Sequence, residues 1–147
     1  MRLYRERFSV TGLYENAVYP GVEPALERLR QCGATLTLVT SKPRVYAKRI
    51  VDHFGLDENL SAVYGSELDG TRTDKAELLA FVLQQSGLQA RDCLMVGDRR
   101  YDAVGARCNG IEAIGVLWGF GSREELQAAG VSRLLERPEQ LGDLMVA

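Results

Sequence analysis

The 147-residue sequence contains few of the residues that build metal and disulfide sites: three cysteines and a single histidine, His53. Cys32, Cys93 and Cys108 form no C-x-x-C pair, which argues against a zinc site or a dithiol redox motif. An odd, scattered set of cysteines is typical of a reducing compartment, so the sequence predicts a cytoplasmic protein with Cys93 in the core. A structural role is expected for His53, which lies in a helical stretch.

An excess of charge of one sign is also lacking, because the net charge is −2 with 26% charged and 46% hydrophobic residues. This composition is that of a globular domain and carries no electrostatic footprint for nucleic acid. The apolar runs are too short to span a bilayer, and the opening MRLYRERFSV lacks the apolar region of a secretory signal. The sequence therefore predicts one domain, with no nucleic-acid or membrane partner.

The residues that are present alternate between helical and strand patterns, without repeats. Helices are expected from Val22 to Gly33, from Pro43 to Gly55, over 75–86, from about 101 to 109 and over 122–129, and strands over 34–39, 62–64, 93–96 and 111–117. Successive apolar residues at 93–96 indicate burial on both faces, as in a central parallel strand. The alternation predicts an α/β fold with a Rossmann-like three-layer α/β/α core and a mainly parallel sheet.

Polar residues follow the predicted strands where such sheets bind ligands, outside the carboxyl ends. Thr40-Ser41-Lys42 follows the first strand, Lys75 opens a helix, and Asp98 and Asp102 follow a later strand. A hydroxyl and backbone N–H groups can hold phosphate oxygens, a lysine can neutralise them, and two aspartates suit Mg²⁺. Each residue alone also suits a turn, a cap or a solvated surface. Their shared placement at strand ends favours a site.

Three segments resemble motifs II, III and IV of the haloacid dehalogenase-like hydrolases: LVTSKP at 38–43, Lys75 in RTDKAELL, and MVGDRRYDAVGA at 95–106. The flanking YPGVEPALERLRQCG and WGFGSREEL resemble the phosphoglycolate phosphatase branch. The resemblance covers nearly the whole chain from Tyr19 onward. It implies a Rossmann-like core, usually with a helical cap, that uses Mg²⁺ and an aspartyl-phosphate to hydrolyse a small phosphorylated metabolite.

The resemblance also implies which residues would bind phosphate. Thr40 would bind the transferring phosphoryl group, with help from the backbone of Ser41. Lys42, which counts among the expected phosphate-binding residues, and Arg44 would lie near the substrate entrance. Which phosphate ester enters stays open, because the cap and entrance loops select the leaving group in this family.

Motifs III and IV imply the charged groups of the site. Lys75 would bridge the phosphate and the nucleophile. Asp98 would ligate Mg²⁺, and Asp102 would ligate it or orient its waters. In physical terms, such a site neutralises charge and positions the partners of an in-line phosphoryl transfer.

The family's first motif, D-x-D-G-T, is missing, because it precedes motif II and residues 1–39 contain no aspartate. Residues 1–18 instead resemble the end of the helical cap, and 19–147 an incomplete core. SELDGT at 66–71 has similar letters, with Glu67 and Asp69 at the carboxylate positions, but it follows motif II. Gly65 and Ser66 are expected to break the short strand before it, and Asp-Gly favours a turn there.

The chain therefore resembles a hydrolase without its first core strand, its nucleophile loop and most of its cap, through truncation or a misplaced start codon. The loss is expected to leave a gap between the strands of motifs II and IV, or to force them together. We expect the chain to be inactive alone. The alternative is a non-catalytic phosphate- or Mg²⁺-binding remnant or interaction module, and the oligomeric state stays open.

Two further α/β readings are less favoured. A receiver-like signalling domain also has Asp, Thr and Lys at the ends of its strands. In that domain the acidic cluster comes first along the sequence, whereas the order in this chain is Thr, Lys, then Asp. A dinucleotide-binding domain is disfavoured because residues 119–121 provide only G-x-G, after a late strand rather than the first.

Overall fold

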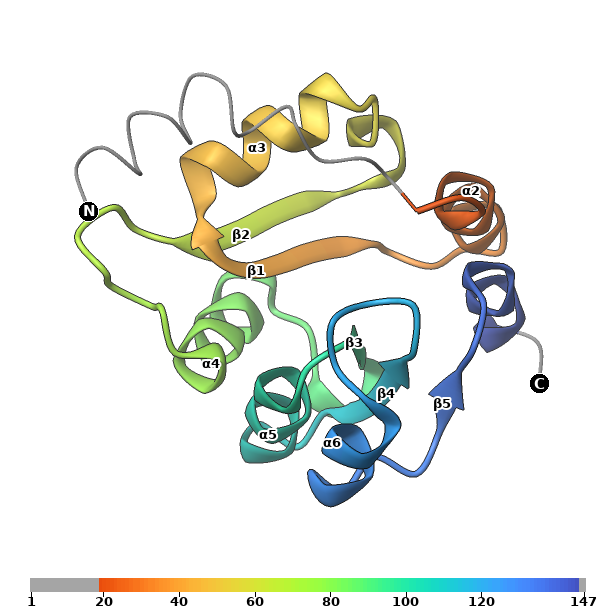
Figure 1. The fold of residues 1–147 in the computed structure, drawn as a ribbon. Helices are drawn as coiled ribbons and strands as arrows, with labels where there is room; N and C mark the ends of the chain where they lie inside the picture. The colour runs from red at the N-terminus through yellow and green to blue at the C-terminus, as the bar shows by residue number, and fades with distance from the viewer. Residues whose placement is uncertain (1–18, 146–147) are drawn as a thin grey trace.

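The computed structural model describes residues 19–145. Two parallel sheets form the middle layer of the molecule (Figure 1). The first sheet contains β1 (Thr37–Pro43) and β2 (Ala62–Ser66), and the second contains β3 (Leu94–Gly97), β4 (Glu112–Val116) and β5 (Leu134–Leu135). Every strand pair is parallel. The expected α/β class with a parallel sheet is confirmed.

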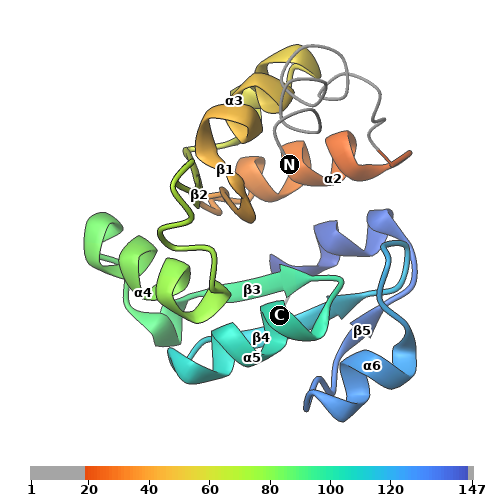
Figure 2. The ribbon, with the colours of Figure 1, turned by 60° about the vertical axis from the view of Figure 1, so that its left-hand side comes forward.

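Helices cover both sides of the sheets. They are α2 (Val22–Gln31), α3 (Arg44–His53), α4 (Lys75–Ser86), α5 (Arg100–Cys108) and α6 (Arg123–Ala128), with short 3₁₀ helices η2 (Asp57–Asn59), η3 (Ala90–Asp92) and η4 (Pro138–Met145). Figures 1 and 2 show α2 and α3 on one side and α4, α5 and α6 on the other. Within residues 19–145, none of these helices has the length and apolar character that a membrane crossing requires.

Helix α4 has the predicted bounds because both of its ends carry clear signals. Asp74 caps the first turn, and its side chain accepts the backbone N–H of Glu77 at 3.0 Å. Gly87 ends the helix in the left-handed conformation, with φ 72°. Leu78 and Leu79 are buried on its inner face together with Lys75, the first residue of the helix. The cap therefore fixes the place where Lys75 enters the interior.

The first sheet differs from its predicted bounds at both strands. β1 begins at Thr37 and ends at Pro43, four residues beyond the predicted end, and its register with β2 is irregular between Val39 and Pro43. The predicted break at Gly65 is wrong, since β2 runs through Ser66. A side chain at Gly65 would meet the carbonyl oxygen of Lys42 at 2.5 Å. This glycine therefore permits the close approach of two strands.

The sheet is split where the first core strand was expected. β1 pairs only with β2, β3 pairs only with β4, and within residues 19–145 no strand lies between β1 and β3. Of the two outcomes expected, the strands stay apart rather than pair with each other. The predicted burial of 93–96 on both faces is also wrong, because β3 is an edge strand here and Leu94 is 43% exposed.

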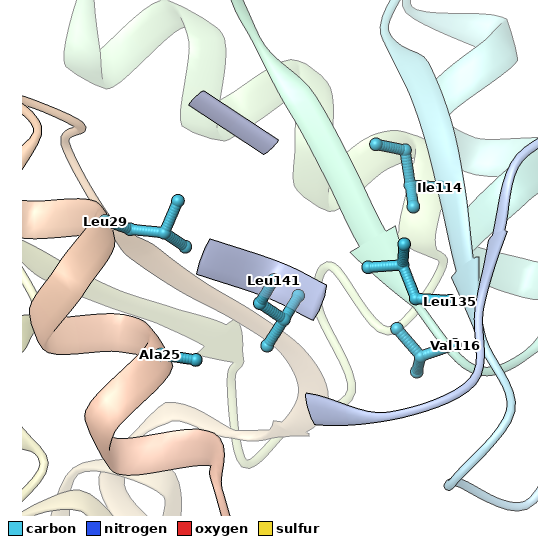
Figure 3. Packing of buried hydrophobic residues seen from close by; sticks show 6 residues of the cluster. All are labelled: Ala25, Leu29, Ile114, Val116, Leu135 and Leu141. Atoms are coloured by element: carbon cyan, nitrogen blue, oxygen red, sulfur yellow. The ribbon is translucent and has the colours of Figure 1, made fainter. Parts of the chain in front are cut away.

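Two apolar clusters hold the separate sheets in one body. The cluster in Figure 3 joins α2 to the second sheet and η4 through Ala25, Leu29, Ile114, Val116, Leu135 and Leu141. On the opposite side, Leu79 of α4 and Ala106 of α5 form a cluster with Ile111. Val39 of β1 and Met95 of β3 both pack against that second cluster. The helices, rather than strand hydrogen bonds, therefore connect the two sheets.

Candidate functional site

Lys75 connects the three segments that the sequence predicts to converge. Its Nζ lies 2.9 Å from Oδ1 of Asp102 on α5, and it donates a hydrogen bond to the carbonyl oxygen of Val39 on β1 at 3.2 Å. The side chains of Lys75 and Asp102 are only 9% and 13% exposed. A buried lysine needs such partners, because an unpaired charge would be costly in this setting. The ion pair is therefore built into the interior between α4, α5 and β1.

Two glycines provide room for this ion pair. A Cβ at Gly105 would lie 2.8 Å from Cγ of Lys75, and a Cβ at Gly97 would overlap the carboxylate of Asp102. Both positions are buried or half-buried, so a larger residue there would displace the pair. The sequence MVGDRRYDAVGA therefore positions Asp102 and Lys75 through its glycines as well as its aspartates.

Asp98 follows β3 and lies at the same end of that strand as the loop after β4. Its Oδ2 accepts the backbone N–H of Phe120 at 2.8 Å, which connects two loops that are 22 residues apart in sequence. Phe120 itself is 88% exposed, so its backbone rather than its side chain contacts the site. The Gly119-Phe120-Gly121 stretch thus has a local role here: its N–H orients Asp98.

Thr40, Ser41 and Lys42 lie within the last part of β1. The hydroxyl of Thr40 accepts the backbone N–H of Lys42 at 3.2 Å, and its own proton can serve another acceptor. The carbonyl of Ser41 accepts the hydroxyl of Ser66 on β2 at 2.9 Å. Partial burial lowers the pKa of Lys42 below the usual lysine value, because desolvation disfavours the charged ammonium.

The SELDGT stretch forms the expected turn. The N–H of Gly70 donates to the carbonyl of Glu67 at 3.0 Å, and Gly70 has φ 94°. Hydrogen bonds from the Thr71 side chain and backbone lower the pKa of Asp69, and the Thr71 N–H lies 2.9 Å from its Oδ1. Glu67 forms an ion pair with Arg72 at 2.7 Å. The two carboxylates therefore stabilise an exposed loop, and the turn interpretation is confirmed.

The aspartates provide a donor set of the kind that Mg²⁺ accepts, which is one or two carboxylates with waters and a substrate phosphate. Within residues 19–145, no three His, Cys, Asp or Glu side chains gather into a complete metal site. Asp98 suits the role of a direct metal ligand, because its hydrogen bond with the Phe120 N–H engages one of its two carboxylate oxygens. Asp102 engages Lys75 through Oδ1 and the N–H of Arg99 through Oδ2. Its contacts suit a residue that orients Lys75.

Sequence reasoning missed two parts of the site's surroundings. Arg99 donates to Glu125 on α6 at 3.2 Å, across 26 residues. Ser122 caps α6 by accepting the N–H of Glu125, whereas the Glu125 side chain contacts Arg99. The hydrogen bond from Phe120 to Asp98 was also missed. Every residue type except proline has a backbone N–H, so the residue type does not predict this hydrogen bond. Only the Gly-x-Gly sequence around Phe120 indicates it.

Similarity to known proteins is strong across this region. The family model of the haloacid dehalogenase-like hydrolases matches residues 2–110. The chain is 55% identical over 125 residues to the 5'-nucleotidase of Pseudomonas aeruginosa, a match that covers 85% of this chain and 57% of that protein. It is also 37% identical over 118 residues to the tyrosine-protein kinase PtkA of Mycobacterium tuberculosis, with 80% and 40% coverage.

The expected likeness to phosphoglycolate phosphatases is confirmed at lower identity. The enzyme of Pseudomonas putida is 29% identical over 137 residues, covering 92% of this chain and 48% of its own length. The crystal structure of a predicted phosphatase from Clostridium acetobutylicum has a TM-score of 0.94 and 38% identity, covering 97% of this chain and 66% of that one. The chain thus spans about half the length of the curated relatives it matches. The expected cap remnant at 1–18 lies outside the described residues.

Proposed function

Because the chain belongs to the haloacid dehalogenase-like hydrolases, we propose that it is the phosphate- and metal-binding part of a phosphomonoester hydrolase. The position of Lys75 carries this proposal: one buried ammonium contacts the end region of β1 and the helix that follows β3. Open parallel sheets bind ligands at this edge, and a lysine there can neutralise a phosphoryl group.

The proposed reaction takes its nucleophile from a segment outside this sequence. An aspartate carboxylate oxygen attacks phosphorus, the bond from phosphorus to the leaving oxygen breaks, and that oxygen takes a proton from a neighbouring acid. Water then hydrolyses the aspartyl-phosphate and releases phosphate. The first aspartate in the chain is Asp52. It lies on α3, which follows β1, whereas the proposed nucleophile would follow a strand that precedes β1. We therefore propose that the chain is inactive alone.

The residues of this chain bind and orient the phosphoryl group. The Thr40 proton and the N–H of Ser41 donate to phosphoryl oxygens, and Lys42 adds a charge near the entrance. Lys75, held by Asp102, lies between the phosphate and the incoming carboxylate and offsets their repulsion. Asp98 would ligate Mg²⁺, which when bound would stabilise the negative charge on the transferring group.

Nucleoside 5'-monophosphates are the first substrate class to test, with phosphoglycolate second. This order rests on the 55% identity to a 5'-nucleotidase and the 29% identity to a phosphoglycolate phosphatase. A second candidate function is a non-catalytic phosphate-binding module. It is supported by the internal contacts of Asp102 and Lys75, because each of these charged groups has a partner within the chain.

A chimera tests the proposed hydrolase directly. Residues of this chain replace the matching region of the Pseudomonas aeruginosa 5'-nucleotidase, which supplies the part that this chain does not span. We expect Mg²⁺-dependent release of phosphate from nucleoside 5'-monophosphates, at a kcat/KM within about tenfold of the parent enzyme's, a difference equal to about 1.4 kcal/mol of transition-state stabilisation.

The control is the parent 5'-nucleotidase, purified and assayed beside the chimera. A chimera that unfolds cooperatively, at a melting temperature close to the parent's, and yet releases no phosphate would favour the non-catalytic module. If neither added Mg²⁺ nor a chelator changed the rate of hydrolysis, the proposed role of Mg²⁺ would be wrong.

A further inference from the structure

Residues 98–99, which connect β3 to α5, lie against the chain that leads into α6. The Phe120 N–H donates to the Asp98 carboxylate at 2.8 Å. Gly121 packs closely on the backbone of Asp98, because a Cβ at this glycine would overlap the Asp98 carbonyl. Ser122 follows directly and is the N-cap of α6. The loop that carries the proposed metal ligand is therefore in contact with the start of α6.

An ion pair between Arg99 and Glu125 adds to these contacts. Arg99 follows Asp98 directly, and Glu125 lies in the first turn of α6. The Nε of Arg99 is 3.2 Å from each of the two carboxylate oxygens of Glu125. The Glu125 side chain is only 19% exposed, and a Cβ at Gly121 would lie 2.6 Å from its Oε2. An enclosed carboxylate needs a cation or several donors, and Arg99 provides the cation.

The backbone of Arg99 contacts the second aspartate of the site. Its N–H donates to Oδ2 of Asp102 at 3.1 Å, while Oδ1 of Asp102 pairs with Lys75. Arg99 is thus bonded to Asp98 along the chain, to Asp102 through its N–H, and to α6 through its side chain. A rotation of the Arg99 backbone would turn the Asp98 carboxylate and break the hydrogen bond to Asp102. The conformation of Arg99 therefore controls the placement of both aspartates.

Capping of α6 does not require the Glu125 side chain. The hydroxyl of Ser122 already accepts the N–H of Glu125 at 3.1 Å. The other ion pair of α6, between Arg123 and Glu136, has side chains that are 45% and 69% exposed, as is usual for a surface pair. The carboxylate of Glu125 is instead enclosed next to a proposed metal ligand. Side chains in such places typically orient the groups that bind the metal.

We propose that Arg99 and Glu125 are positioning residues for the Mg²⁺ site, and that their ion pair holds residues 98–99 in the metal-binding orientation. Glu125 fixes the side chain of Arg99, and Arg99 fixes the backbone next to Asp98. The Phe120 N–H engages Oδ2 of Asp98, which leaves Oδ1 for the cation. Neither Arg99 nor Glu125 contacts the metal in this arrangement. The inference rests on the proposed function, because it takes Asp98 as the metal ligand.

Removal of the Arg99 charge separates positioning from simple electrostatics. The cation of Arg99 repels Mg²⁺, so its charge alone predicts tighter metal binding by Arg99→Met. Positioning predicts the opposite, a dissociation constant raised at least about tenfold, which is the usual result of losing a group that orients a metal ligand. Arg99→Lys keeps the charge and can place its ammonium close to the present Nε. It should bind Mg²⁺ with nearly the affinity of the unsubstituted chain.

Titration of the isotope-labelled 147-residue chain with Mg²⁺, followed by NMR at constant ionic strength, measures these affinities without an activity assay. The Phe120 amide is the reporter, because it donates directly to Asp98. We expect a saturable shift of its signal, with a higher Kd in both Arg99→Met and Glu125→Gln. The double variant should bind no more weakly than Arg99→Met alone, because both substitutions break the same interaction.

Two further variants make the test specific. Arg123→Met is the matched control, because it removes the same charge from the exposed ion pair of α6 and should leave the Kd unchanged. Glu125→Asp keeps the charge but withdraws the carboxylate from Arg99, so it should also weaken Mg²⁺ binding. It replaces Arg99→Met if circular dichroism shows that Arg99→Met does not fold.

Equal or tighter Mg²⁺ binding by Arg99→Met would overturn the inference and leave the proposed function intact. A loss in Glu125→Gln that Arg99→Met does not share would also overturn it, because Glu125 would then contact the metal itself. If the Phe120 amide of the unsubstituted chain did not respond to Mg²⁺, the proposed metal role of Asp98 would be wrong, and the inference would be wrong with it.

Discussion

Replacing Lys75 with methionine is expected to lower the free energy of unfolding by about 3 kcal/mol, because it leaves the 13%-exposed Asp102 carboxylate without its cation. Methionine keeps most of the side-chain volume, so the loss reports the charge rather than a cavity. The Val39 carbonyl also loses its donor. Urea denaturation of the 147-residue chain, followed by circular dichroism, measures the change.

A double-mutant cycle shows whether the effect belongs to the ion pair. Asp102→Asn keeps an oxygen for the Arg99 N–H but removes the charge, and combined with Lys75→Met it should recover at least about 1 kcal/mol of the loss. Arg123→Met is the matched control, because its pair with Glu136 is exposed and should contribute less than about 1 kcal/mol. Additive losses in the cycle would mean that Lys75 and Asp102 do not depend on each other.

Asp98→Asn is expected to reduce hydrolysis by the 5'-nucleotidase chimera about a thousandfold, which corresponds to about 4 kcal/mol of transition-state stabilisation. The substitution removes a negative metal ligand, while an amide oxygen can still accept the Phe120 N–H. The melting temperature should therefore change by only a few degrees. Titration of kcat/KM with Mg²⁺ should show a higher requirement for the metal in the variant.

The matched control for this variant is Asp143→Asn, a surface aspartate that pairs with Arg28 at 61% side-chain exposure. It should leave both hydrolysis and the Mg²⁺ titration unchanged. If the Asp98 variant retained more than about a tenth of the parent activity, a difference of about 1.4 kcal/mol, Asp98 would not be a ligand to the metal.

The helices of this fold were readable from the sequence because their ends carry local chemistry. Asp74 and Gly87 mark α4 at both ends, and the observed bounds equal the predicted ones. The strands were less readable. Thr40–Lys42 looks like a loop by composition, and it is part of β1 because pairing with β2 resumes beyond it, at Pro43. The two residues of β5 are too few for any period to be detected.

The convergence of Lys75 with Asp102 was predicted, since carboxyl ends of parallel strands share one edge, and their ion pair agrees with it. The link from Arg99 to Glu125 could not be predicted, because it depends on how α5 and α6 pack. The error at β3 is the most informative. Its successive apolar residues are typical of a central strand, whereas β3 is an edge strand within residues 19–145, so sequence and structure disagree at this edge.

Phosphate release from p-nitrophenyl phosphate by the purified 147-residue chain with Mg²⁺ tests the central claim most directly. We predict no turnover above the level of an Asp98→Ala variant prepared in parallel, because no aspartate precedes β1 in this sequence to act as the proposed nucleophile. Robust turnover by the 147-residue chain that disappears in the Asp98→Ala variant would contradict this, and would mean that the chain contains its own nucleophile.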